Sequence, residues 1–228
     1  IIIHESGHEW YANNITYKDI ADMWVHESFT NYSESLFLEY YYGKDAAAEY
    51  IIGCRKNIHN DTPIIGHYDV NNEGSGDMYP KGASMLHMIR QVINDDAKWK
   101  SILRGMNKTF YHQTVTGKQI QDYINEQSGI NFNRVFAQYL TTTQIPVFEY
   151  MFKNGTFGYH WTNCVSKFDM PVRVKLNGVE TWLKLFLEEL DKKPWYDLGE
   201  PSKRFEILAM RSCSTLWRKR HTCYFLTR

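Results

Sequence analysis

The sequence predicts an α+β protein in which a mainly helical domain precedes a smaller β-rich one. Through residues 1–145, apolar residues recur at helical spacing between capping residues and glycines that begin and end the helices. After Pro146 the pattern changes to short runs of β-branched and aromatic residues separated by Asn-Gly pairs, which are typical of β-hairpins. We therefore expect a helical domain at 1–145, the start of a β-rich domain at 146–187 and an irregular tail at 188–228.

Capping residues set most of the helix boundaries that we expect in the first domain. Thr16 and Asp19 form a capping-box pattern that should open the second helix, and Gly43 should end it. A second such pattern, Thr116 with Gln119, should open the helix before the last. A long polar loop at 59–78 separates the third helix from the fourth. The other expected helices cover residues 1–13, 45–58, 80–94, 96–111 and 131–142.

Composition and charge exclude several classes of function. The chain has 26 basic and 26 acidic residues, and this balance argues against a general role at nucleic acids or membrane surfaces. No apolar run approaches the length of a membrane span. The four cysteines are scattered without a C-x-x-C pair, so the sequence indicates neither a zinc ribbon nor a disulfide framework. We expect a globular protein with neither a nucleic-acid partner nor a membrane span.

The strongest functional signal lies near the start of the chain. His4, Glu5 and His8 form an H-E-x-x-H motif, and Glu27 follows after eighteen intervening residues. Positions i and i+4 share one face of a helix, so His4 and His8 can direct their ring nitrogens at a single point. A glutamate from a second helix would complete the set of ligands that leaves a fourth position open in catalytic zinc sites. The motif therefore predicts Zn²⁺ held by His4, His8 and Glu27, with histidines buried in a core as the alternative.

Around these residues the sequence resembles the aminopeptidase N and leukotriene-epoxide hydrolase family of zinc metallopeptidases, a group of gluzincins. The resemblance rests on HESGHEW at residues 4–10, DMWVHESF at 22–29, and Tyr79-Pro80-Lys81-Gly82-Ala83, which is similar to the Y-x-K-G-A element of the family. It covers about residues 1–145. The resemblance implies a thermolysin-like catalytic domain, mainly α-helical, followed by a small β-sandwich-like domain.

The resemblance also implies roles for three further residues. Glu5 is expected to be the general base that takes the proton of a zinc-activated water, and Tyr79 to donate its hydroxyl to the developing oxyanion. Glu34 matches an acidic position in the family and could accept the second N–H of a ligand histidine, with a solvated acid as the alternative. The implied reaction is the removal of N-terminal residues from peptide substrates.

The chain departs from the family pattern at several positions. It has Tyr11-Ala12-Asn13 where the family often shows F-G-N, and His26 and Ser28 flank Glu27 where the family often shows N-E-G. The G-x-M-E-N motif, whose glutamate holds the substrate amine in relatives, is absent from the sequence. We therefore expect a fragment of a multidomain protein, with the missing N-terminal domain of the same protein as a partner.

Two other functions stay open. A thermolysin-like zinc endopeptidase would use the same types of ligand, although the sequence around Tyr79 argues against it. A non-catalytic peptide-binding or scaffolding module would not need Glu5 together with three intact ligands. The sequence does not determine the preferred N-terminal residue, the oligomeric state or the compartment, for which a secreted or periplasmic location is favoured over a cytoplasmic one.

Overall fold

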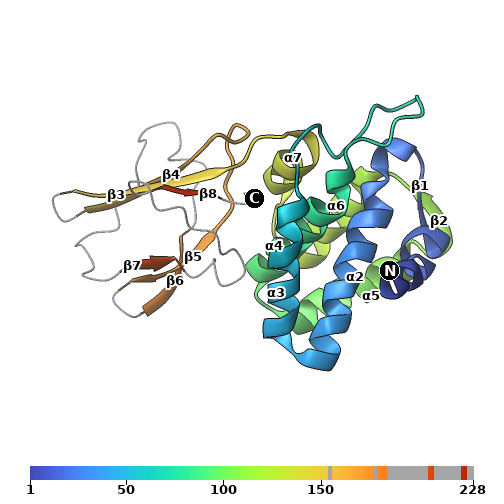
Figure 1. Ribbon diagram of the computed structural model, residues 1–228, viewed down its shortest axis with the longest axis horizontal. Coiled ribbons are helices and arrows are strands. Elements are labelled where there is room, and N and C mark those ends of the chain that lie inside the picture. The colour runs from blue at the N-terminus through green and yellow to red at the C-terminus, as the bar shows by residue number, and fades with distance from the viewer. Residues whose placement is uncertain (154–155, 177–178, 184–204, 208–221, 225–228) are drawn as a thin grey trace. The chain divides into compact units, whose positions relative to one another are not determined.

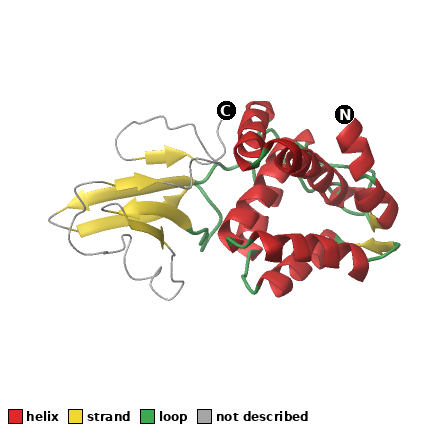
Figure 2. Ribbon diagram, turned by 90° about the horizontal axis from the view of Figure 1, so that it is seen from below, coloured by secondary structure: helices red, strands yellow, loops and turns green. Residues whose placement is uncertain are grey.

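The computed structural model describes residues 1–153, 156–176, 179–183, 205–207 and 222–224. The chain divides into two compact units, Ile1–Thr143 and Gln144–Arg228. Helices make up most of the first unit, and the described elements of the second are strands (Figures 1 and 2). The prediction of a helix-rich protein that also contains β-structure is confirmed.

The first unit is built from α-helices that enclose a core rich in aromatic side chains. Helix α2 packs against α1, α3 and α4, and so lies between the start of the chain and the later helices. Trp24, Phe29 and Tyr32 on α2 are buried, as is Trp99 on α5. The helices are α1 Ile2–Gly7, α2 Trp24–Tyr42, α3 Lys44–Cys54, α4 Pro80–Ile93, α5 Asp96–Thr109, α6 Gly117–Ser128 and α7 Asn133–Thr141. None of these described helices combines the length and the hydropathy of a membrane span.

Several helix ends form where the capping residues predict them. Asp95 accepts a hydrogen bond from the Lys98 amide at the start of α5. Thr116 and Gln119 form the complete capping box at the start of α6. That helix ends at Gly129 in the left-handed conformation (φ 72°), which glycine adopts without steric cost.

The start of the chain differs from the expected long helix. Helix α1 ends at Gly7, and Glu9–Asn14 forms a π-helical turn in which Tyr11 leaves the helical conformation (φ −123°, ψ 73°). Residues Ile15–Tyr17 then form strand β1, which pairs in parallel with strand β2, Gln113–Val115. The chain can therefore turn away from the helix directly after His8.

The predicted capping box of Thr16 and Asp19 is wrong. Thr16 lies within β1, and its hydroxyl donates to the carbonyl oxygen of Ala12. Asp19 instead caps a short 3₁₀ turn, Ile20–Asp22, where its side chain accepts from the Ala21 amide at 2.9 Å. The pairing of β1 with a distant strand overrides the local capping signal.

The long loop between α3 and α4 is tied down at its two ends. After the 3₁₀ turn Arg55–Asn57, the amides of His59 and Asn60 donate to the buried carboxylate of Asp77, at 2.8 and 2.7 Å. Asp77 itself lies in a second 3₁₀ turn, Gly76–Met78, which leads directly into α4. The two ends of the loop therefore lie close together, and these hydrogen bonds fix the position of residue 79 directly before α4.

The described strands of the second unit form two antiparallel sheets of three strands each. Their orders are β4-β3-β8 and β6-β5-β7. The hairpins β3–β4 and β5–β6 occur where the sequence predicts them, whereas the predicted Asn-Gly turns at 154–155 and 177–178 lie outside the described residues. Two of the strands fall within 188–228, where the sequence shows no usable periodicity. The strands are β3 Val147–Lys153, β4 Thr156–Thr162, β5 Val172–Leu176, β6 Val179–Leu183, β7 Phe205–Ile207 and β8 Thr222–Tyr224.

Candidate metal centre

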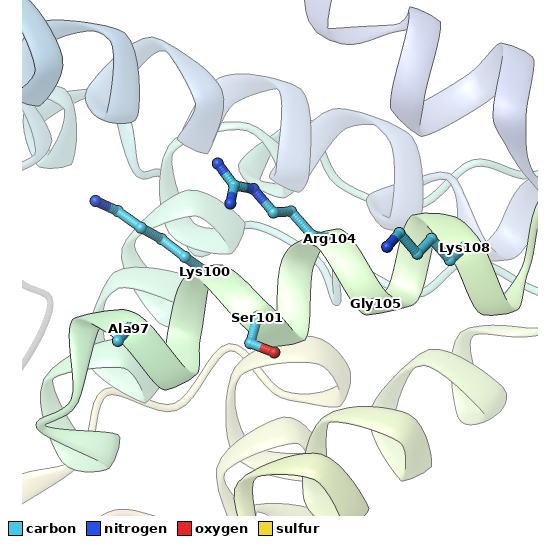
Figure 3. A pocket seen from close by; sticks show the side chains of 6 residues that line it. All are labelled: Ala97, Lys100, Ser101, Arg104, Gly105 and Lys108. Atoms are coloured by element: carbon cyan, nitrogen blue, oxygen red, sulfur yellow. The ribbon is translucent and has the colours of Figure 1, made fainter.

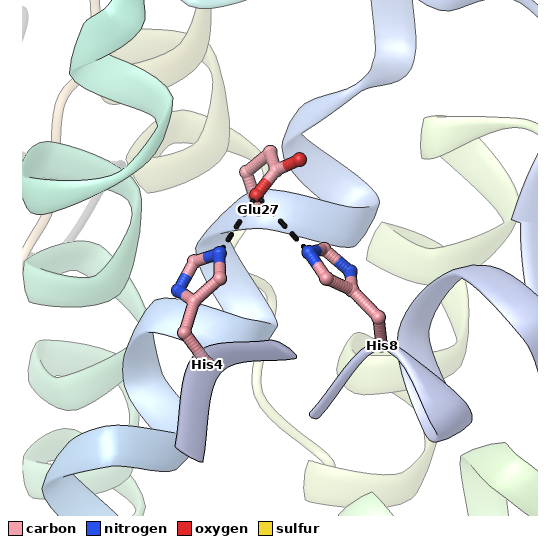
Figure 4. Close-up of side chains that lie close together, drawn as sticks. All are labelled: His4, His8 and Glu27. Atoms are coloured by element: carbon pink, nitrogen blue, oxygen red, sulfur yellow. Dashed lines mark hydrogen bonds and ion pairs between the residues drawn. The ribbon is translucent and has the colours of Figure 1, made fainter. Parts of the chain in front are cut away.

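Three side chains that the sequence singles out converge on one point (Figure 4). His4 lies on α1, His8 caps the end of that helix, and Glu27 lies in the first turn of α2. The Oε2 atom of Glu27 is 3.1 Å from Nε2 of His4 and 3.7 Å from Nε2 of His8. In a tetrahedral zinc site with metal–ligand distances of about 2.0–2.2 Å, neighbouring ligand atoms are roughly 3.3–3.6 Å apart. The cluster therefore has dimensions that suit one metal ion.

The outer ring nitrogens of the two histidines have acceptor partners of their own. Nδ1 of His8 lies 3.0 Å from the carbonyl oxygen of Tyr11, and Nδ1 of His4 lies 3.3 Å from Oε1 of Glu34. Because a carbonyl and a carboxylate only accept, these contacts favour a proton at Nδ1 and a lone pair at Nε2. Both lone pairs then face the Glu27 carboxylate. Three acceptors that converge in this way would be satisfied by a cation.

A small residue lets α1 approach α2 closely enough to form the cluster. Gly7 is buried, and a Cβ atom at this position would lie 3.1 Å from Cγ2 of Thr30 on α2. Thr30 is also buried, and its hydroxyl lies 3.3 Å from Nε2 of His4. Glycine between the two histidines therefore sets the distance from their helix to Glu27.

Glu34 is held between two helices beside the cluster. One of its carboxylate oxygens faces Nδ1 of His4, and the other accepts a hydrogen bond from the hydroxyl of Tyr50 on α3. Burial raises the pKa of Tyr50, and the neighbouring Glu34 charge raises it further, so the hydroxyl remains a donor. The contacts form a chain from Tyr50 through Glu34 to His4.

Tyr79 lies directly before α4, with its ring beside that of His4 at a centroid distance of 5.8 Å. Burial raises the pKa of Tyr79, and the charges of Glu27, Glu73 and Glu5 raise it further. The hydroxyl therefore keeps its proton at neutral pH, and in this structure it donates a hydrogen bond to Glu27. Glu5 is exposed on α1.

His26 is a further residue of the site that the sequence marks only as a departure from the family pattern. It is buried, and its Nε2 accepts from the Tyr17 amide at 3.1 Å. Burial lowers the pKa of His26 to about 4, and the nearby His8 lowers it too. His26 is therefore neutral, and its ring packs 6.5 Å from that of His8 between centroids.

Two residues at the site, Thr30 and Tyr50, are not among those that the sequence singles out. Thr30 is three residues after Glu27 and four before Glu34, so helical periodicity places it on the same face of α2 and could have identified it. Tyr50 comes from another helix, and no sequence spacing connects it to Glu34.

A surface hollow of about 420 Å³ lies elsewhere in this unit, along α5 (Figure 3). It is lined by Ala97, Lys100, Ser101, Arg104, Gly105 and Lys108. All six residues come from one helix, and none belongs to the histidine–glutamate cluster. The hollow is therefore not part of the candidate metal centre.

A comparison with known protein families identifies the family of this chain. Residues 1–139, more than half of its length, match the profile described as the Peptidase family M1 domain. The chain belongs to this family. The family resemblance inferred from the H-E-x-x-H, Glu27 and Tyr79 segments is therefore confirmed.

The curated relatives that this chain resembles match it over only part of their own length. The chain is 23% identical over 158 residues to probable aminopeptidase 1 of Sulfurisphaera tokodaii, an alignment that covers 64% of this chain and 20% of that protein. It is 26% identical over 160 residues to aminopeptidase N of Lactococcus lactis, covering 64% of this chain and 19% of the relative. The chain thus spans about a fifth of the length of these relatives.

Two solved structures share the fold. An M1 zinc metallopeptidase from Deinococcus radiodurans superposes with a TM-score of 0.52 at 23% identity, covering 61% of this chain and 32% of that one. Aminopeptidase A of Legionella pneumophila, in complex with aspartic acid, gives a TM-score of 0.64 at 15% identity, covering 89% of this chain and 24% of that one. At these identities the similarity concerns the fold alone.

Proposed function

We propose that this chain carries the metal ligands, general base and oxyanion donor of a zinc-dependent aminopeptidase. The convergence of His4, His8 and Glu27, whose ligand atoms all lie within 4.8 Å of one another, is the observation that carries the proposal. The names of the matched relatives, aminopeptidases and zinc metallopeptidases, support the reaction class and the identity of the metal. In this proposal residues 1–145 are a thermolysin-like catalytic domain, and a β-sandwich-like domain follows it.

The proposed ligand atoms are Nε2 of His4, Nε2 of His8 and a carboxylate oxygen of Glu27. When bound there, zinc would polarise the scissile carbonyl and lower the pKa of a water to about 7. Glu34 and the carbonyl of Tyr11 hold the two rings with their lone pairs toward the ion. These contacts orient the ligands before the metal arrives.

Glu5 and Tyr79 have complementary roles in the proposed reaction. Glu5 follows His4 in the motif and would accept a proton from the attacking water, then transfer it to the leaving nitrogen. Tyr79 would donate its hydroxyl to the oxygen on which negative charge develops. The raised pKa of Tyr79 supports this role, because a phenol must keep its proton in order to donate it.

The substrates would be peptides with a free N-terminal amine. Since the curated relatives are about five times as long as the matched segment, we propose that another part of the same protein, an N-terminal domain, supplies the amine-binding wall of the cleft. The preference for a particular N-terminal side chain would also depend on that wall.

The proposal is tested in the full-length protein with Glu5→Gln, which preserves the size of the side chain but removes the proton acceptor. Zinc content should stay the same while turnover of an N-terminally unblocked peptide falls by roughly 10²–10⁴. The matched control is Glu9→Gln, which removes an exposed charge one turn further along the chain. Near-normal kcat in Glu5→Gln would rule out Glu5 as the base.

The alternative functions are separated by two further measurements. Faster cleavage of an N-acetylated peptide than of its free form would favour an endopeptidase. Absence of zinc from the wild-type protein would favour the non-catalytic module, and a His8→Ala variant that retains the zinc content of the wild type would exclude the proposed ligand set.

A further inference from the structure

A buried serine connects the metal-ligand helix to the segment that carries Tyr79. Ser28 follows Glu27 on α2, is 0% exposed, and donates its hydroxyl to the carbonyl oxygen of Met78 at 2.7 Å. Met78 is the residue directly before Tyr79. The hydrogen bond therefore joins the neighbour of a proposed ligand to the neighbour of the proposed oxyanion donor, across 50 residues of sequence.

The bonded carbonyl belongs to the peptide group that leads into Tyr79. A peptide group is planar, so fixing the direction of the Met78 carbonyl also fixes the amide nitrogen and Cα of Tyr79. Within the turn, the Tyr79 amide donates to the Gly76 carbonyl at 3.3 Å, and the Tyr79 carbonyl accepts from the Ala83 amide at 3.0 Å. Neither bond involves the Met78 carbonyl. The Ser28 hydroxyl donates to that carbonyl from outside the turn, at 2.7 Å, and so adds a restraint on the direction of this peptide group.

The packing around Ser28 leaves little room for another arrangement. A Cβ atom at Gly82, in the first turn of α4, would lie 1.9 Å from the hydroxyl oxygen of Ser28. The serine side chain therefore lies in the space that the missing side chain of Gly82 leaves open. Ser28 also stands where the resembled family often has glycine, so a residue without a hydroxyl at this position is compatible with the fold.

We propose that Ser28 is a positioning residue whose hydroxyl holds Tyr79 in register with His4 and Glu27. The inference rests on the proposed function of Tyr79 as oxyanion donor. A hydrogen-bond donor stabilises an oxyanion only within a narrow range of distance and direction. A displacement of about 1 Å in a catalytic group can cost 10²-fold in rate. Loss of the Ser28 hydroxyl should therefore lower kcat while leaving metal and substrate binding in place.

The first test measures how firmly the backbone at Tyr79 is held, without reference to metal or activity. In Ser28→Ala, hydrogen exchange at the amides of Met78 and Tyr79 should become faster by about fivefold, the effect of losing one ordinary hydrogen bond. The matched control is Ser35→Ala, since Ser35 is a second buried serine on α2 and donates to the Ala47 carbonyl at 3.3 Å. Unchanged exchange at both amides in Ser28→Ala would overturn the proposal.

The second test is a double-mutant cycle in the full-length protein. Ser28→Ala should lower kcat about tenfold with KM and zinc content unchanged, an effect smaller than that of losing the tyrosine hydroxyl itself. In a Tyr79→Phe background the same change should have almost no further effect, because the serine acts through that hydroxyl. An equal loss of kcat in both backgrounds would overturn the proposal. Ser28→Gly repeats the test with the residue that the family often has.

The two tests separate failure of this inference from failure of the proposed function. If Tyr79→Phe left kcat unchanged, the proposed role of Tyr79 would be wrong, whatever Ser28 does. Faster exchange at Met78 and Tyr79 in Ser28→Ala would still support the positioning contact. Unchanged exchange at Met78 and Tyr79 in Ser28→Ala, together with a large fall in kcat in Tyr79→Phe, would overturn the positioning role of Ser28 and leave the proposed role of Tyr79 in place.

Discussion

Replacing Glu34 with glutamine should weaken zinc binding without unfolding the protein. The Glu34 side chain is 18% exposed, with one oxygen 3.3 Å from Nδ1 of His4 and the other bonded to the hydroxyl of Tyr50. Glutamine has the same shape and can still accept from His4. It lacks the negative charge that makes the imidazole a stronger ligand.

The expected loss follows from the position of Glu34 behind a ligand. Removing such a partner typically reduces metal affinity by about 10–100-fold, or roughly 1.4–2.7 kcal/mol. Because the carboxylate is mostly shielded from water, its charge acts strongly on His4, and we expect a loss of zinc affinity in the upper half of this range. Tyr50→Phe leaves the charge in place and removes one hydrogen bond, so its effect should be smaller, about fivefold.

The assay is competition for zinc between the protein and a chelator of known affinity, at fixed pH and ionic strength. Glu49→Gln is the control, because Glu49 is an exposed glutamate on the same helix as Tyr50. A Kd for zinc in Glu34→Gln within twofold of the wild type would refute the reasoning. So would an equal loss in Glu49→Gln, which would indicate a general effect of charge.

Three further predictions concern catalysis and stability. Tyr79→Phe should lower kcat by about 10²–10³ with little change in KM, measured in the full-length protein; an unchanged kcat would make Tyr79 a packing residue. Burial lowers the pKa of His87 to about 4, so the folded state disfavours the protonated side chain. The contribution of His87 to the free energy of unfolding should be fully present above pH 6.5 and fall by up to about 3 kcal/mol as the pH drops toward 4. Urea titrations should show that His87→Leu reduces the pH dependence by this amount, and an unchanged dependence in the variant would contradict the prediction. Arg90→Met should cost about 2–4 kcal/mol in urea unfolding, because the guanidinium is 6% exposed and bonds both oxygens of the part-buried Glu39 as well as Asp96 at 2.8 Å. A cost below about 1 kcal/mol would show that these ion pairs contribute little.

Much of the helical unit could be predicted from the sequence because short-range contacts determine its helix ends. Asp95 and the Thr116–Gln119 pair bond to backbone amides within three residues, so the signal and the structure are local. The pairing of Ile15–Tyr17 with Gln113–Val115 is different, since the two strands lie far apart in the sequence. No local pattern specifies such a partner, and the sequence therefore suggested a cap at Thr16.

The proximity of His4 and His8 could be predicted because their spacing needs only one helical turn. That prediction did not require the long helix that we expected, since α1 ends at Gly7 and His8 still caps it. The contacts of Tyr50 and Ser28 could not be predicted in the same way. Tyr50 on α3 bonds Glu34 on α2, and Ser28 on α2 bonds Met78 in the turn before α4, so both contacts depend on how segments distant in the sequence pack together.

In the proposed function, His4, His8 and Glu27 together bind one zinc ion. X-ray diffraction data from crystals grown with zinc, collected on both sides of the zinc absorption edge, would locate the ion. We expect one strong anomalous peak within about 2.0–2.2 Å of Nε2 of both histidines and of a Glu27 oxygen. A protein saturated with zinc that shows no peak at this cluster, or a peak held by other residues, would contradict it.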